Sequence, residues 1–313
     1  EYQAGRRDWN KRSKEGFDAA IKHFEKAIEL DPNYADPYVG LADTYGLLPA
    51  YNFAGPKDAM PKAKAYAQQA MKKNPNLASA YISTAWVQHI YEYNWADAEI
   101  NYRKGIKLNS NYATGHHWFG ILLYSTGREK LAYDFLSKAE ELDPSSKIIK
   151  CEFAFCCMLL NKKEESSRIV EKALAIDPYF RFSLEIKHMW LKIGDIDSAL
   201  FTIEQAKKQY PNQPAYLGLL FDLNWRENRE AQALRCLVDL LDLHQGMVQH
   251  TEIARRYFAM DEPENAYRWL QWAIDRREPF VPLIPNFPNL KKYHSDSRFR
   301  ELFKKINHPM YLD

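Results

Sequence analysis

Hydrophobic and polar positions alternate with a helical period along most of the chain, and short turns interrupt that period at regular intervals. In residues 119–144, FGILLYSTGREKLAYDFLSKAEELDP, the pattern predicts two short helices separated by a turn at Gly127. Pro144 cannot continue a helix and disfavours helical angles at the residue before it, so the second helix is expected to end there. The pattern predicts an all-α protein built from paired helices.

Small residues occur in both predicted helices of this stretch, at Gly120, Ala132 and Ala139. Glycine inside a helix costs roughly 1 kcal/mol relative to alanine, so the missing side chain must bring a compensating gain. Two antiparallel helices joined by a short turn approach closely only where their side chains are small. We therefore expect Gly120 and Ala132 to lie at the crossing of the pair, and Ala139 to contact the next pair.

The same arrangement of small, bulky and proline positions recurs along the chain. One copy has Ala20, Phe24, Ala27 and Pro32, a second has Ala63, Ala67, Ala70 and Pro75, and a third has Ala132, Leu136, Ala139 and Pro144. The step from Pro144 to Pro178 is 34 residues. The positions that we assign to the structure of the repeat are Ala42, Ala63, Gly120, Ala132, Ala139 and Pro144.

This spacing resembles the tetratricopeptide repeat (TPR), whose pattern is W-x2-L-G-x2-Y, A-x3-F, A and P. The resemblance covers residues 1–277 and implies a right-handed TPR superhelix, an α-solenoid of about eight helix pairs. A single pair cannot bury its apolar face, whereas stacked pairs build a continuous core. Residues 278–313 form a separate Pro-rich segment, whose prolines favour an extended chain, followed by a helix that begins at Asp296 and caps the open end.

The repeats are uneven in length. Residues 47–61, LLPAYNFAGPKDAMP, are an insertion at one repeat turn, and we expect it either to pack locally or to cover the groove and contact a ligand. With stretches such as GRRDWNKRSKEGFDAAIKHFEKAIELDP and DSRFRELFKKI, the chain is similar to the C-terminal TPR half of bacterial multidomain signalling proteins. These are transcriptional regulators, nucleotide cyclases and Ser/Thr kinases with a TolB-like segment. The resemblance implies an output domain upstream, in a longer protein.

The composition argues against two classes of partner. Lys and Arg number 43 against 41 Asp and Glu, so no basic excess points to nucleic acid. The sequence has no run of about 18 apolar residues that could span a membrane. The four cysteines form no C-x-x-C motif and are expected to be buried free thiols. We expect a cytoplasmic protein, with the periplasmic side of a membrane-anchored parent as the alternative.

The inner surface of the predicted superhelix carries apolar and aromatic residues in its middle repeats, which is typical of a groove for a peptide or helix. The alternative is a superhelix that curls so tightly that these residues contact one another. Asp43, Ile121 and Met189 stand where chaperone-binding TPRs have asparagines, so a carboxylate clamp is not expected. The candidate partner-binding residues on this concave face are Trp86, His89, His117, Tyr124, Phe155, Met158, Met189, Trp225 and Arg255.

No motif of a P-loop, dinucleotide fold, zinc protease or serine hydrolase occurs, and the nine histidines are scattered. We expect no catalytic residue, no metal site and no cofactor. The sequence therefore predicts a non-catalytic interaction or sensory module that binds a protein segment, or its own upstream domain, through repeats three to five. The alternative is a structural spacer or a homodimerisation scaffold for an upstream regulator or cyclase domain.

Overall fold

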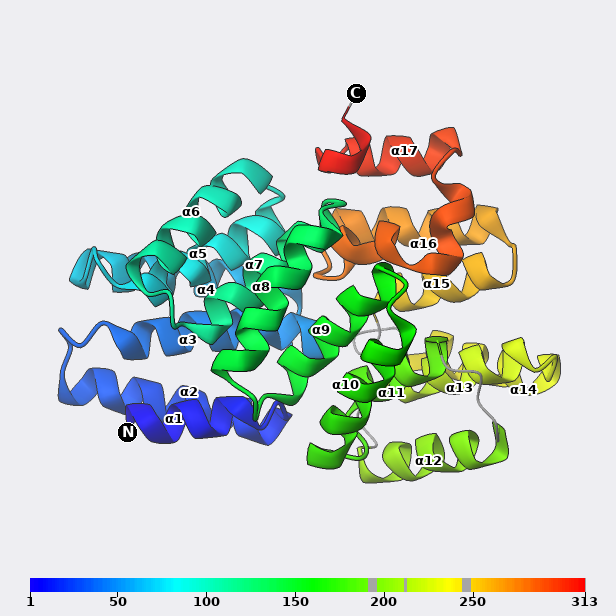
Figure 1. Ribbon diagram of the computed structural model, residues 1–313, viewed down its shortest axis with the longest axis horizontal. Helices are drawn as coiled ribbons and strands as arrows, with labels where there is room; N and C mark the ends of the chain where they lie inside the picture. Colours follow the sequence, from blue (N-terminus) through cyan, green and yellow to red (C-terminus); the bar gives the residue numbers. More distant parts are fainter. Residues whose placement is uncertain (191–195, 211–212, 244–248, 313) are drawn as a thin grey trace.

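The computed structural model describes residues 1–190, 196–210, 213–243 and 249–312, and all regular structure in these ranges is helical. Within these described ranges, eight antiparallel helix pairs follow one another (Figure 1). The first helices are α1 (Tyr2–Asn10), α3 (Asp36–Leu47), α5 (Ala78–Val87), α7 (Ala113–Ser125), α9 (Lys147–Leu159), α11 (Arg181–Trp190), α13 (Ala215–Arg226) and α15 (His250–Ala259). The second helices are α2 (Lys14–Leu30), α4 (Pro56–Lys73), α6 (Trp95–Leu108), α8 (Glu129–Leu142), α10 (Lys163–Ile176), α12 (Ile196–Gln209), α14 (Glu230–Leu243) and α16 (Pro263–Arg276).

First and second helices differ in their neighbours and in their burial. Each first helix from α1 to α13 contacts the first helix of the following pair, so these helices form the inner layer of a solenoid. In α7 every residue from Gly115 to Ser125 is buried, whereas α8 buries only the stripe Ala132, Leu136 and Ala139. A helix that is apolar on all sides belongs inside, and a helix with one apolar stripe belongs at the surface.

The small residues of the repeat lie at helix contacts. A methyl group at Gly120 would lie 2.6 Å from Cγ of Leu136, which belongs to the second helix of the same pair. Ala63, Ala132 and Ala139 are completely buried, and Ala42 is nearly so. In contrast, Pro144 is exposed, two residues beyond the end of α8.

The segment after α16 folds back along the inside of the solenoid. It contains two 3₁₀ helices, η3 (Val281–Asn286) and η4 (Pro288–Tyr293), then α17 (Ser297–Lys304) and a last 3₁₀ turn, η5 (Pro309–Tyr311). The expectation of an extended segment was therefore wrong. Pro282 and Pro288 occupy the opening positions of η3 and η4, where a helix needs no backbone N–H. Asp296 caps α17 by accepting a hydrogen bond from the Arg298 backbone N–H at 2.9 Å.

Contacts between distant parts of the chain close the solenoid on itself. The Trp95 indole donates a hydrogen bond to the carbonyl of Ile306 at 3.0 Å, and the Asn286 amide donates to the carbonyl of Tyr124 at 2.8 Å. The third and fourth pairs thus contact the C-terminal segment (Figure 1). Among the described residues, no helix combines the length and the hydrophobicity needed to cross a membrane.

The insertion takes part in this closure. Its 3₁₀ helix η1 (Leu48–Tyr51) accepts a hydrogen bond at the Pro49 carbonyl from the Gln249 amide, at 2.7 Å. The Arg181 guanidinium donates to the next carbonyl, Ala50, at 3.2 Å. The insertion therefore bridges the second pair to the sixth and eighth pairs across the inner surface.

Candidate functional site

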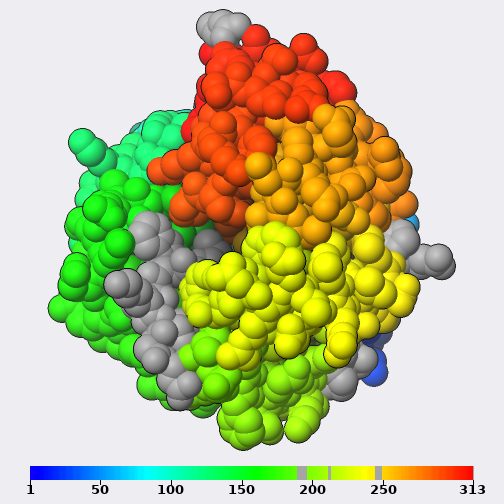
Figure 2. Space-filling model, turned by 90° about the vertical axis from the view of Figure 1, so that its right-hand side faces the viewer, coloured from blue at the N-terminus to red at the C-terminus, as the bar shows by residue number. Residues whose placement is uncertain are grey.

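Two adjoining cavities lie on the inner surface, and together we call them the inner chamber. The smaller one, of about 60 Å³, lies between α9, α11, α15 and η3. The larger one, of about 380 Å³, lies between α11, α13, α15 and η4. Glu185 and Arg255 line both cavities. Figure 2 shows the end of the molecule formed by α12, α13 and α14, with the C-terminal segment above them.

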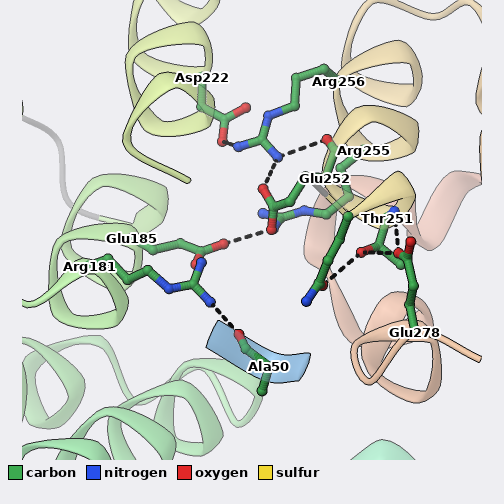
Figure 3. A network of polar contacts seen from close by, with 10 residues as sticks. Ala50, Arg181, Glu185, Asp222, Thr251, Glu252, Arg255, Arg256 and Glu278 are labelled. Carbon is green, nitrogen blue, oxygen red and sulfur yellow. Dashed lines mark hydrogen bonds and ion pairs between the residues drawn. The ribbon is translucent and has the colours of Figure 1, made fainter. Parts of the chain in front are cut away.

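Ion pairs connect three of the first helices around the chamber, α11, α13 and α15 (Figure 3). Arg255 of α15 contacts Glu185 of α11, with 2.8 Å between Nη1 and Oε1. The neighbouring Arg256 contacts Asp222 of α13 at 2.9 Å and Glu252 of its own helix at 2.5 Å. Since the Arg256 side chain is only 1% exposed, its charge depends on both carboxylates for compensation.

The carboxylates of this network are perturbed in opposite directions. Burial raises the pKa of Asp222, and the attraction of Arg256 and Arg255 counters this only in part. Burial would also raise the pKa of Glu252, but Arg256 and Arg255 lower that pKa to about 2. Glu252 is thus the firmly ionised member of the network, and it shares the compensation of the two adjacent guanidinium groups with Glu185 and Asp222.

The N-terminus of α15 is capped by a carboxylate from beyond α16. Glu278 accepts hydrogen bonds from the backbone N–H groups of His250 and Thr251, at 2.8 and 3.0 Å, and from the Thr251 hydroxyl at 3.1 Å. The two backbone N–H groups are donors that a helix start leaves unpaired, and a negative charge is favourable there. The cap fixes α15, and with it Arg255 and Gln249, against the rest of the chamber (Figure 3).

Glu152 is the second acidic feature of the chamber. Its Oε2 accepts a hydrogen bond from the Tyr124 hydroxyl at 2.6 Å, and its side chain lines the smaller cavity beside Phe155 and Phe287. Burial raises the pKa of Glu152 to about 7, and Glu185 adds to the shift while the Tyr124 hydrogen bond opposes it. Neither Glu152 nor the residues of the C-terminal segment were among the candidates.

The structure brings four of the candidate residues to the chamber. Tyr124 and Phe155 line the smaller cavity, Trp225 lines the larger one, and Arg255 lines both. The Arg255 guanidinium also lies over the ring of Phe287, at 3.8 Å from its centre. Repeat periodicity identifies the inner helix faces, but Phe287 lies outside the repeats and only the closed fold brings it to them.

Four other candidates are buried and line neither cavity: Trp86, His89, His117 and Met158. Trp86 stacks on Trp118 at 4.6 Å and donates to the carbonyl of Gly46 at 3.1 Å. His89 lies with Nε2 at 3.3 Å from the Ser125 hydroxyl. The expectation that these four are exposed on an open wall is thereby corrected, because the tight curl of the inner layer packs them against neighbouring helices. Met189 lies in α11, but its side chain is outside the described residues.

Residues 11–48 match the family model described as TPR repeat. A comparison with curated proteins finds no matching sequence. Among solved structures, the chain is similar to the human IFIT1 dimer with PPP-AAAA, at 16% identity over 83% of this chain and 68% of the other, with a TM-score of 0.58. It is also similar to a chain of the APC/C hetero-tetramer Cut9-Hcn1, at 14% identity over 93% of this chain and 52% of the other, with a TM-score of 0.60.

At such identities these similarities show the fold alone, a TPR-like solenoid. Together with the match of residues 11–48, they support the tetratricopeptide repeat family. Solenoids of this kind generally act as non-catalytic scaffolds that bind proteins or peptides on an extended concave surface. No family of enzymes is indicated.

Proposed function

We propose that the protein is an interaction module that binds a segment of a protein in the inner chamber, chiefly in its larger cavity. The observation that carries this proposal is the location of that cavity. The insertion and the C-terminal segment cover the inner surface of the middle repeats, whereas about 380 Å³ stays open between α11, α13, α15 and η4.

Trp225 offers an apolar anchor at this cavity. Its ring is half-buried and stacks on Phe221 at 5.8 Å, while its indole N–H donates to the carbonyl of Ala259 at 3.1 Å. The indole is therefore held in one orientation before any ligand arrives, which reduces the entropy lost on binding. Tryptophan is among the residues that dominate binding energy at protein interfaces.

The charges at the chamber favour a protein segment over a nucleic acid. The larger cavity is lined by Glu185 and Asp222 as well as by Arg226 and Arg255. Mixed charges orient a polypeptide, whose backbone and side chains donate and accept hydrogen bonds. A phosphate chain such as the PPP-AAAA of the IFIT1 complex requires an excess of cations, and both carboxylates would repel it.

The bound segment belongs to a partner protein or to an upstream domain of the same longer chain. The second source gives the module its sensory role, because the chamber would then report on the state of an output domain. Both sources present a polypeptide to the same cavity, and the first test is common to them.

A displayed library of random 12-residue peptides, selected on the wild-type protein, tests the proposal. We expect the enriched peptides, labelled with a fluorophore, to bind Trp225→Ala at least tenfold more weakly than wild type in anisotropy titrations, because a central tryptophan at an interface is worth about 2 kcal/mol or more. Trp272→Ala is the matched control, since Trp272 is 43% exposed on α16 and lines neither cavity. Circular dichroism melts establish that both variants fold.

The proposal fails if no peptide is enriched, or if the enriched peptides bind Trp225→Ala as well as wild type. The alternative function, a structural spacer or a homodimerisation scaffold, would then be favoured. Analytical ultracentrifugation of the wild-type protein would test whether it forms a dimer.

A further inference from the structure

Glu152 has few partners for a half-buried carboxylate that lines a cavity. It accepts the hydrogen bond from Tyr124, and among the described residues it makes no ion pair. Buried carboxylates are normally paired with a cation, because an isolated ion in a low-dielectric site is costly. The side chain lines the smaller cavity, so a cation that enters this cavity would meet it.

The other charged groups around this cavity have their own partners. From α11, Arg181 donates to the Ala50 carbonyl and lies over the Phe182 ring, while Glu185 pairs with Arg255. From α15, Glu252 pairs with Arg256 and lies 3.6 Å from Arg255. The remaining polar lining groups, from α7, α9 and the start of α15, are the uncharged side chains of Tyr124, Cys151 and Thr251. Glu185 and Glu252 are thus each paired with a guanidinium group, whereas Glu152 makes no ion pair among the described residues.

From this geometry we propose that the smaller cavity receives the ammonium group of a lysine side chain of the bound segment, with Glu152 as its counter-ion. The inference rests on the proposed function, and it names the chemistry that the chamber selects in its partner.

The walls and the size of the cavity suit an ammonium group on an aliphatic stem. Phe155, Phe182 and Phe287 line it, and such aromatic walls pack well against the methylene groups of a lysine stem. A water molecule needs roughly 10–15 Å³ of such volume, so about 60 Å³ holds an ammonium group and its last methylenes. Since the two cavities adjoin at Glu185 and Arg255, a segment in the larger one can extend a lysine into the smaller one.

Binding of the lysine is coupled to a proton. Burial raises the pKa of Glu152 to about 7, so near neutral pH part of the empty population carries a protonated carboxyl. An ammonium group favours the ionised form, so the site must release that proton to bind. Affinity therefore falls as the pH drops through 7, by about tenfold between pH 8 and pH 6.

An NMR titration of the whole chain with n-butylammonium, a mimic of the lysine side chain, tests the site itself. We expect n-butylammonium to bind about tenfold more tightly at pH 8 than at pH 6. The uncharged n-butanol should show no such pH dependence. Glu152→Gln keeps an acceptor for Tyr124 and should abolish the binding of the amine, whereas Glu141→Gln, at an exposed position of α8, should not change it.

A second arm uses the peptides selected on the chamber, with each lysine replaced in turn by methionine. One replacement should weaken binding to wild type by tenfold or more and have no effect on binding to Glu152→Gln. If the amine binds Glu152→Gln as tightly as wild type, the lysine site is refuted. If binding of the peptides depends on Trp225 but on no lysine, the lysine site is refuted while the proposed function stands. If n-butylammonium nevertheless binds, the smaller cavity is a site for free amines.

Discussion

Gly120 allows the two helices of the fourth pair to approach closely. With Leu136 Cγ only 2.6 Å from the position of an added methyl group, a larger residue forces the helices apart or forces Leu136 out of its rotamer. Leu136 is completely buried between α7 and α8, so it has no free space into which it can move. The cost of glycine in a helix is offset here by the packing that its missing side chain permits.

Gly120→Ala should therefore destabilise the protein by about 1–3 kcal/mol, the usual cost of overpacking a core. Urea unfolding followed by circular dichroism measures this change. Combining it with Leu136→Val, which removes part of the obstructing side chain, should cost less than the sum of the two single substitutions. Stabilisation by Gly120→Ala, as helix propensity alone predicts, would contradict the close approach.

Periodicity predicts contacts of this kind, because Gly120 and Leu136 repeat the spacing of other pairs and their contact is local. It does not predict the surroundings of Glu152, because Phe287, which lines the same cavity, lies 135 residues further along the chain. Periodicity also predicts wrongly that Trp86 and His89 are exposed, because the curvature of the whole array decides whether an inner face reaches solvent.

Among the elements, the 3₁₀ helix η3 joins the inner surface to the C-terminal end. Asn286, at its last position, donates to the carbonyl of Tyr124, which also accepts a hydrogen bond from the Gly127 backbone N–H. The sequence indicates a capping helix at Asp296, because cap and amphipathic face are local signals. It does not indicate the inward path of residues 281–293, because that path is set by contacts with α7 and α15 that no local pattern encodes.

Asn286→Ala should lower the free energy of unfolding by about 1 kcal/mol, since one buried hydrogen bond is lost while the carbonyl keeps its other donor. Asn289→Ala is the matched control, because Asn289 is an exposed asparagine in the adjacent η4. Guanidinium titrations of both variants provide the measurement. Equal losses in the two would indicate that the hydrogen bond to Tyr124 does not hold the segment in place.

At the scale of the molecule, the closed fold buries histidines in their uncharged form. Burial lowers the pKa of His89 and His117 to about 3, and that of His188 and His308 to about 4. In the unfolded chain these groups bind protons below about pH 6.5, whereas the folded protein does not. Stability is therefore fully present above pH 6.5 and is lost as the pH falls towards 4. Glu152 opposes this trend, because its raised pKa lets the folded protein bind one proton that the unfolded chain binds only at lower pH.

Acidification from pH 7 to pH 5 should thus destabilise the protein steeply, by up to about 1.4 kcal/mol per pH unit for each of these histidines. His89→Phe replaces a ring that lies among Trp86, Trp95 and Tyr102. Between pH 6.5 and 5 the free energy of unfolding of the variant should fall less steeply than that of the wild type, by the contribution of about one proton. Urea midpoints over this pH range measure both slopes, and parallel slopes would argue against a neutral, buried His89.

The contacts of the insertion with Gln249 and Arg181 also fix the number of repeats. An open array tolerates duplication or loss of one pair, because each pair meets only its neighbours. Here an additional pair between α8 and α9 would turn the later helices past the Pro49 and Ala50 carbonyls and would draw Asn286 away from Tyr124. These closing contacts therefore constrain the number of repeats, as closure constrains the number of units in a ring. Evolution can change the side chains of this protein more freely than its number of repeats.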